Sequence, residues 1–167
     1  IAAVVEKMPS VRATFVVDYL GEAGTVAATI GKAQALDEAI AGFAPLPLTF
    51  ERLPFEHPLY ILFSSGTTGI PKCIVHSAGG TLLQHVKEHR LHAGIGDGDR
   101  FFYFTTCGWM MWNWLVSGLA SGATLLLYDG SPFHPDGNVI FDYARDWKMT
   151  YLGTSAKFID SVRKANL

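Results

Sequence analysis

Residues 60–72 read Tyr-Ile-Leu-Phe-Ser-Ser-Gly-Thr-Thr-Gly-Ile-Pro-Lys, so a short apolar run leads directly into a loop of hydroxyls and glycines. The run predicts a strand over 60–63, and the next nine residues hold four hydroxyls, two glycines and one lysine. Glycine lets a backbone approach an anion, and exposed N–H groups and hydroxyls form a nest of donors. This composition suits a phosphate group with Lys72 as its countercharge, although it is also typical of an ordinary surface turn.

A Walker A loop is the first phosphate loop to consider, and its spacing is not present. That motif has the form G-x-x-x-x-G-K-S/T and opens a helix. Here Lys72 follows Pro71, and the next residues, Cys73-Ile74-Val75, form an apolar run. We therefore expect a second strand, over 72–76, where a Walker A loop requires a helix.

Outward from the loop, short apolar runs alternate with windows of helical periodicity. Further strands are expected over 101–105, 123–128 and 149–152, and helices over 80–91, 112–120, 138–146 and 156–164. Upstream, the pattern predicts a helix end over 1–7, a buried strand over 11–18 and a helix over 37–43 capped by Asp37. Apolar strands that alternate with helices indicate an α/β fold with a mostly parallel sheet flanked by helices on both faces.

The domain organisation follows from length and proline content. A chain of 167 residues supports one core, so we expect residues 1–167 to form a single, partial domain. Four prolines interrupt the periodicity over 44–58, which predicts a long ordered loop or an edge segment. The sequence starts without Met and stops at Leu167 in what is expected to be a helix, which suggests a piece of a larger protein.

Composition narrows the class of partner. About half of the residues (49%) are apolar and 17% are charged, which excludes bulk disorder. The net charge is −2 without a run of like charges, so small molecules are expected as partners rather than nucleic acid. No stretch reaches the roughly 18–20 apolar residues of a membrane span, so no membrane partner is expected. Cys73 and Cys107 lie far apart, which does not suit a secreted disulfide scaffold and fits a reduced cytoplasm.

Cysteine and histidine residues between 73 and 92 loosely suggest a zinc site. Cys73 and His76 lie three residues apart along an expected strand, so their side chains point to opposite faces. His85, His89 and His92 share one side of the expected helix and flank its apolar stripe, where polar residues normally meet solvent. We therefore expect exposed histidines on this helix and no metal ligand in this chain.

The loop carries a family resemblance. Residues 64–72 match, in order, the signature S/T-S-G-S/T-T-G-x-P-K of the AMP-forming, acyl-adenylate-forming synthetases, which the chain therefore resembles. The resemblance covers roughly residue 49 to the end, whereas residues 1–48 carry no matching motif. The other stretches that support it are 50–59, 105–113, 128–130 and 153–156. Within the family, these stretches most resemble ligases that activate acetoacetate.

The resemblance implies part of the large N-terminal domain of an acyl-CoA-synthetase-like fold and a two-step reaction. A carboxylate attacks the α-phosphate of ATP to give acyl-adenylate and pyrophosphate, and the thiol of coenzyme A then displaces AMP. The implied cofactors and co-substrates are ATP, magnesium and coenzyme A. Acetoacetate is the implied acid, with acetate or another short acid as an alternative. The alternative to an enzyme is a non-catalytic module that binds a nucleotide.

The resemblance also implies which residues bind. The implied ATP phosphate-binding residues are Ser64, Ser65, Gly66, Thr67, Thr68, Gly69 and Lys72. Thr67, Thr68 and Lys72 are the candidates for direct contact. Trp109, Met110 and Met111 are implied to line the acyl pocket, because a large indole leaves room only for a small acid.

A third segment, Gly153-Thr154-Ser155, lies between an expected strand and an expected helix. Thr154 or Ser155 is expected to cap the helix. Ligands bind beyond the carboxyl ends of strands in open α/β sheets, so the segment is also a candidate lining of the acyl or adenylate site.

The remaining functional elements of the family are implied to lie beyond Leu167, the last residue of this sequence. They are an acidic residue that helps to hold magnesium, an aspartate that holds ribose, and a lysine of the C-terminal domain that assists adenylation. No catalytic residue is therefore expected between Ile1 and Leu167, and this piece alone is expected to be inactive. Its incomplete sheet suggests that it self-associates.

Overall fold

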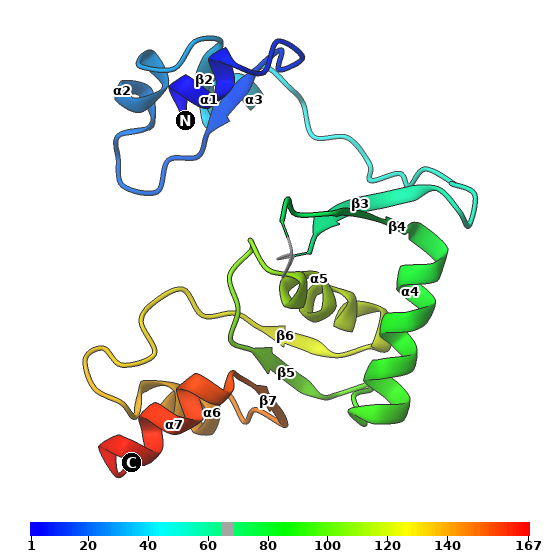
Figure 1. Cartoon of the computed structure of the whole chain (residues 1–167), viewed down its shortest axis with the longest axis vertical. Coiled ribbons are helices and arrows are strands. Elements are labelled where there is room, and N and C mark those ends of the chain that lie inside the picture. Colours follow the sequence, from blue (N-terminus) through cyan, green and yellow to red (C-terminus); the bar gives the residue numbers. More distant parts are fainter. Residues whose placement is uncertain (65–68) are drawn as a thin grey trace. The chain divides into compact units, whose positions relative to one another are not determined.

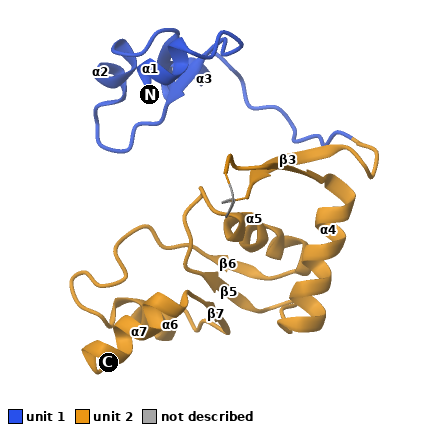
Figure 2. Ribbon diagram, viewed as in Figure 1, with its two compact units in different colours: residues 1–51 blue, residues 52–167 orange. Residues whose placement is uncertain are grey.

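A computed structural model describes residues 1–64 and 69–167 (Figure 1). The chain divides into two compact units, residues 1–51 and 52–167, which Figure 2 shows in different colours. The boundary between the units falls inside the proline-rich segment 44–58, which has no helix or strand before Pro58. None of the helices in the described residues is long and apolar enough to cross a membrane.

The first unit pairs two short strands and adds three short helices. Its elements are α1 (Ala2–Glu6), β1 (Thr14–Val16), α2 (Ala23–Ala28), β2 (Ala33–Ala35) and α3 (Leu36–Ile40), and β1 runs parallel to β2. The buried strand expected over 11–18 is wrong in part, because β1 is shorter and Phe15 and Val17 are exposed. The cap expected from Asp37 is also wrong. Because β2 runs directly into α3, Ala35 takes the N-cap position and Asp37 lies in the first turn.

The second unit combines an antiparallel hairpin with a parallel sheet. Its elements are β3 (Pro58–Phe63), β4 (Cys73–Ser77), α4 (Ala78–Lys87), a π-helical turn η1 (Glu88–His92), β5 (Arg100–Tyr103), α5 (Met110–Val116), a 3₁₀ turn η2 (Ser117–Ser121), β6 (Thr124–Leu126), α6 (Val139–Asp146), β7 (Tyr151–Gly153) and α7 (Ala156–Ala165). β5 lies between β6 and β7 and is parallel to both. β3 and β4 pair only with each other among the described strands.

The expected α/β class is confirmed, and every element expected downstream of residue 57 is present within a few residues. The single, mostly parallel sheet is found only in part. The described strands form three separate sheets, of which two are parallel and one is antiparallel. Nine residues separate β3 from β4, which is too short for the crossover of a dozen or more residues that parallel neighbours require.

The helix expected to contain Leu167 ends two residues earlier, so that expectation is wrong. α7 ends at Ala165, and Asn166 has a φ of +56°, in the left-handed region. The N–H of Leu167 donates to the carbonyl of Val162, and the N–H of Asn166 donates to the carbonyl of Arg163, both at 3.2 Å. This pair of bonds is a Schellman motif, which satisfies carbonyls that the last helical turn leaves free.

The core lies against the two faces of the β6-β5-β7 sheet. Phe101 and Phe102 are neighbours on β5 and point to opposite faces, with exposed fractions of 0% and 2%. Phe101 belongs to an apolar cluster that contains Leu115 of α5. Phe102 belongs to a second cluster that contains Ile140 of α6 and Phe158 of α7. Each fully buried phenylalanine contributes about 1.5–3 kcal/mol to folding, so β5 anchors the unit.

The histidine side of α4 and η1 faces the interior, which is the reverse of the expectation. His85 is 8% exposed and His89 is 0% exposed, whereas Leu82 and Leu83 are 49% and 67% exposed. The expectation of solvent-facing histidines is therefore wrong for these two residues. Periodicity cannot reveal that both imidazoles have hydrogen-bond partners in α5 and η2, which is the condition for burying a polar group.

Candidate functional site

The expected phosphate-binding loop leaves the open end of the β3–β4 hairpin. The last pair of the ladder is Phe63 with Cys73. One residue further, the N–H of Ser64 donates to the carbonyl of Lys72 at 3.0 Å. The N–H of Lys72 donates to Ser64 Oγ at 3.4 Å. These two hydrogen bonds close the base of the loop, so the hairpin determines where the loop begins and ends.

Ser64, Gly69 and Lys72 are the expected phosphate-binding residues that the structure describes, and residues 65–68 lie outside the described part. Gly69 has a φ of +143°, which favours glycine over residues with a Cβ. The Lys72 side chain is exposed, and no carboxylate of the described residues forms an ion pair with it. Its positive charge is therefore available to an anionic ligand.

Met110 and Met111 line an open cavity of about 900 Å³. Its walls come from the β3–β4 hairpin, from α4, from the first turns of α5 and from residues of β5 and β7. Phe63, the residue before the loop, also lines it. The structure therefore brings the expected acid-binding methionines and the base of the expected phosphate loop to one hollow.

Trp109 is not part of the lining of this cavity. Its side chain is 70% exposed, and its backbone occupies the N-cap position of α5. The structure thus places the indole apart from the methionines that follow it, although the three residues are consecutive. Met110 itself is 45% exposed, so the entrance of the cavity is open in the described residues.

Titratable side chains line the cavity on the side of α4 and η1. His85 and Glu88 both line it. Burial lowers the pKa of His85, and positive charge on His89 or His76 would lower it further, while Glu88 opposes the shift. His85 is therefore a neutral hydrogen-bonding group near pH 7 rather than a cation.

Gly153 is the last residue of β7, and Thr154 and Ser155 connect this strand to α7. Ser155 Oγ accepts a hydrogen bond from the Phe158 N–H at 3.2 Å, so the expected N-cap is confirmed for Ser155. A Cβ at position 153 would clash with the ring of Tyr103, so this ring packs directly on the glycine backbone. Thr154 Oγ1 is buried and has no hydrogen-bond partner among the described residues. These three residues line neither this cavity nor the one described next.

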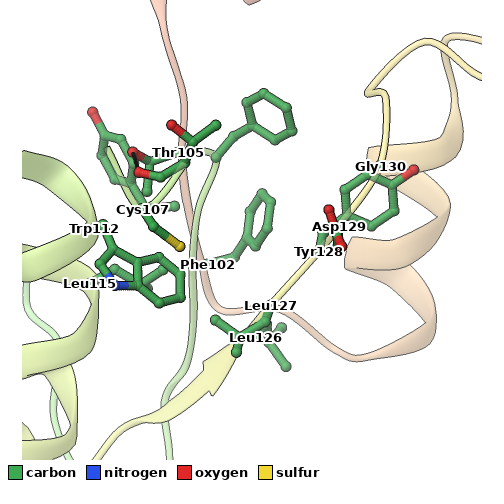
Figure 3. Close-up of a pocket in the computed structure, with 13 residues that line it drawn as sticks. Phe102, Thr105, Cys107, Trp112, Leu115, Leu126, Leu127, Tyr128, Asp129 and Gly130 are labelled. Atoms are coloured by element: carbon green, nitrogen blue, oxygen red, sulfur yellow. Dashed lines mark hydrogen bonds between the residues drawn. The ribbon is translucent and has the colours of Figure 1, made fainter. Parts of the chain in front are cut away.

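A second cavity, of about 440 Å³, lies at the carboxyl ends of β5 and β6 (Figure 3). Residues 103–107 and 126–130 supply most of its lining, and Trp112 and Leu115 of α5 supply the rest together with Phe102. Figure 3 shows Cys107 and Trp112 on one side of Phe102, and Tyr128 with Asp129 on the other. Tyr103 lines both cavities and lies between them.

Residues 105–107 and 128–130 are not among the site residues expected from the sequence. Both stretches directly follow an apolar run and end it with polar residues or glycine. Parallel neighbours bring their carboxyl ends to the same edge, which is where ligands bind in open α/β sheets. The signal was therefore present, but the adjacency of β5 and β6 is a property of the sheet and not of either run.

The family of AMP-binding enzymes matches residues 1–166, and the chain belongs to this family. The names of similar proteins specify an activity more narrowly than the description of the family does. The acetoacetyl-coenzyme A synthetase of Rhizobium meliloti (strain 1021) is 69% identical over 151 residues, which are 90% of this chain and 23% of that protein. The acetoacetyl-CoA synthetase of Gallus gallus is 47% identical over 169 residues, which are 99% of this chain and 25% of that protein.

A solved structure is also similar to this chain. Acetoacetyl-CoA synthetase from Streptomyces lividans superposes with a TM-score of 0.84 at 42% identity, covering 99% of this chain and 25% of that chain. The resemblance to acyl-adenylate-forming synthetases, first seen in the loop, is confirmed by these comparisons. The chain spans about a quarter of the length of these relatives.

Proposed function

We propose that this chain supplies the ATP phosphate-binding loop and part of the acid pocket of a ligase that joins acetoacetate to coenzyme A. The observation that carries the proposal is the hairpin loop closed by Ser64 and Lys72, whose lysine ammonium has no carboxylate partner among the described residues. Membership of the AMP-binding family and 69% identity to an acetoacetyl-coenzyme A synthetase support it.

In the first half-reaction, a carboxylate oxygen of acetoacetate attacks the α-phosphorus of ATP. The bond from that phosphorus to the bridging oxygen of pyrophosphate breaks, and negative charge accumulates on the leaving group. Donors already in position around the β- and γ-phosphates stabilise this charge without reorganisation. Lys72 supplies a positive charge at this point, together with the hydroxyls of Thr67 and Thr68, which lie outside the described residues.

In the second half-reaction, the sulfur of coenzyme A attacks the carbonyl carbon of the acyl-adenylate. The carbon–oxygen bond to AMP breaks, AMP leaves, and the thiol proton passes to solvent or a base. Magnesium that accompanies ATP is held largely by phosphate oxygens. The described residues contain no group of three His, Cys, Asp or Glu side chains that could hold a metal ion, so the proposal assigns no metal ligand to them.

The lysine that assists adenylation is proposed to lie beyond Leu167 in the longer protein, and no residue of this chain is assigned a catalytic role. The support is the length of the relatives, of which this chain spans about a quarter. The chain alone is therefore proposed to be inactive, and every activity measurement below uses the intact ligase.

The acid pocket is proposed to be the cavity that Met110 and Met111 line. Apolar pockets discriminate between acids mainly by volume, so these side chains set an upper limit on acid length. Trp109 is proposed to contribute at the entrance, and Gly153, Thr154 and Ser155 at the adenylate side of the sheet. Acetoacetate is favoured over acetate or another short acid by the names of the relatives.

At the level of the fold, both units are proposed to belong to one adenylating domain of a longer protein. β6 and β7 are the edges of their sheet among the described strands. Open edges pair readily, so further strands would extend this sheet into a mostly parallel one, and the isolated chain would self-associate. Cys73 and Cys107 are free and exposed, which fits a cytoplasmic protein.

The test is Lys72→Ala in the intact ligase, with acetoacetate-dependent release of pyrophosphate as the readout. Loss of a donor to the leaving group is expected to lower kcat/KM by about 10²–10³-fold. Lys157→Ala is the matched control, because Lys157 is another exposed lysine and makes no ion pair in the described residues. Equal rates in the two variants would contradict the proposal.

The acid is tested separately with a panel of acetoacetate, acetate and butyrate. We expect kcat/KM to be highest for acetoacetate. A preference for acetate would still support the adenylating function, but it would contradict acetoacetate as the proposed acid. Binding of ATP without pyrophosphate release from any acid would instead indicate a non-catalytic nucleotide-binding module.

A further inference from the structure

A continuous chain of hydrogen bonds joins α4 and η1 to α5 and η2. His85 Nδ1 lies 2.7 Å from Ser117 Oγ, and this hydroxyl lies 2.9 Å from the carbonyl oxygen of Trp114. His89 Nε2 lies 3.0 Å from the same carbonyl oxygen. His89 Nδ1 lies 3.3 Å from Ser121 Oγ. The backbone carbonyl of Trp114 is therefore the centre of the network.

Donors and acceptors in this network balance with both imidazoles neutral. A carbonyl can only accept, so His89 Nε2 carries the hydrogen and its Nδ1 accepts from the Ser121 hydroxyl. Ser117 Oγ donates its single proton to a backbone carbonyl, so it accepts from the Nδ1–H of His85. Burial lowers the pKa of both histidines, which favours the same neutral state.

The indole of Trp114 also packs against the rings of His89, Phe101 and Tyr103. Its ring centroid lies 4.5 Å from that of His89 and 5.1 Å from that of Phe101, which meets it edge-on. The Tyr103 ring lies 5.9 Å away, also near perpendicular. Aromatic pairs at these separations and angles are attractive beyond the area they bury.

Trp114 connects this network to the cavity. It lies one helical turn after Met110 and Met111 on α5, a helix of seven residues, and all three line the 900 Å³ cavity. Residues three and four apart are neighbours on one helix face, so a rotation or shift of α5 that moves Trp114 also moves the methionines. His89 itself is not part of the lining. Its side chain contacts Trp114, Phe101 and Ser121, and its ring centroid lies 6.4 Å from that of His85, which does line the cavity.

We propose that His89 is a positioning residue for the acid substrate, which sets the place of Met110 and Met111 by fixing Trp114. This inference rests on the proposed function in one respect, because it takes the cavity to be the acid pocket. None of the described residues of the β3–β4 hairpin makes a hydrogen bond to His89. Loss of His89 therefore affects acid binding and leaves ATP binding unchanged.

The test compares His89→Leu, His89→Gln and His92→Leu in the intact ligase. Gln presents an N–H close to the position of the lost Nε2–H, so it restores the bond to Trp114. His92 is a histidine of the same π-helical turn with an exposed side chain, which makes it the matched control. We expect His89→Leu to raise the KM for acetoacetate about tenfold, because small misplacements of a binding wall are costly.

The KM for ATP is expected to stay within about twofold in every variant, and His89→Gln is expected to recover most of the acid affinity. Thermal unfolding confirms that each variant is folded, and Ser121→Ala, which removes only one donor to His89, replaces His89→Leu if that variant is not. An unchanged KM for acetoacetate in a folded variant overturns the proposal. A parallel rise in both KM values also overturns it, because it indicates general loosening.

A second readout separates this inference from the proposed function. Amide hydrogen exchange over residues 110–117 is measured in His89→Leu and His92→Leu. Faster exchange in His89→Leu alone supports the positioning of α5 even if the wild-type protein releases no pyrophosphate with acetoacetate, which would defeat only the proposed function. Equal exchange in the two variants overturns the positioning role whatever the activity.

Discussion

β5 and the β3–β4 hairpin are both apolar strand regions of the second unit, but they differ in how far their side chains are buried. Phe101 and Phe102 of β5 are 0% and 2% exposed, whereas Ile61 and Phe63 of β3 are 55% and 68% exposed. β5 has a strand on each edge and an apolar cluster against each face, but the hairpin strands have only each other among the described strands. An apolar run therefore predicts a strand, and its burial depends on partners that are distant in sequence.

The two regions also differ in their roles in the second unit. β5 is the scaffold, and the hairpin presents a loop at its open end. Binding residues are commonly found on loops that a rigid scaffold positions. Substitutions in β5 should consequently act on stability, and substitutions in the hairpin should act on activity with little effect on stability.

The largest effect on stability is expected for Phe101→Ala. The Phe101 ring packs edge-on against Trp114 and Tyr151, at centroid separations of 5.1 and 5.3 Å. Removing a fully buried phenylalanine ring costs about 3–5 kcal/mol of unfolding free energy through lost burial and the cavity left behind. Equilibrium unfolding in urea measures this. A loss below about 1 kcal/mol would mean that β5 is not the anchor of the unit.

The local elements around both regions could be predicted from sequence. Apolar runs over 60–63, 72–76, 101–105, 123–128 and 149–152 predict β3, β4, β5, β6 and β7. α2 and β2 were not expected, because Ala23–Ala28 and Ala33–Ala35 are short and carry no marked periodicity. What local patterns could not supply was pairing, so three sheets were expected as one.

In the candidate site, too, local sequence predicts some features, and contacts between distant segments decide others. The loop 64–72 is predicted to bind phosphate because its consecutive residues match the family signature, and its binding residues stay a prediction. The histidine network was missed, since His85 and His89 find their partners 32 residues later at Ser117 and Ser121. Trp109 shows the converse: its neighbours line a cavity while its own side chain is 70% exposed, which depends on the exact start of α5.

A change of pH should have an intermediate effect and should act through the region around β5. His89 packs against Phe101, and burial lowers the pKa of His89 below its usual value of 6.5. The unfolded chain therefore binds more protons than the folded chain once the pH falls below about 6.5, and stability decreases with falling pH. His85 acts in the same direction.

Each histidine is expected to contribute at most about 1.4 kcal/mol of lost stability per pH unit between its unfolded and folded pKa values. Urea unfolding at pH 7.5, 6.5 and 5.5 measures the slope, and His89→Gln should reduce it. Asp99 and Asp160 have pKa values lowered by hydrogen bonds, but they lose their stabilising effect only at more acidic pH. A flat profile down to pH 5.5 would show that both imidazoles are accessible to protons in the folded state.

The smallest effect on stability is expected for Phe63→Ser in the hairpin. Phe63 is 68% exposed and lies at the last pair of the β3–β4 ladder, so the 167-residue chain should change by no more than about 0.5 kcal/mol. The same substitution in the intact ligase separates two explanations of the exposed face. A similar small value there would mean that the hairpin works as a free arm, whereas a loss of about 2 kcal/mol or more would mean that another part of the longer protein covers Phe63. A loss of that size already in the 167-residue chain would contradict the contrast with β5, because it would require Phe63 to be buried by residues of this chain.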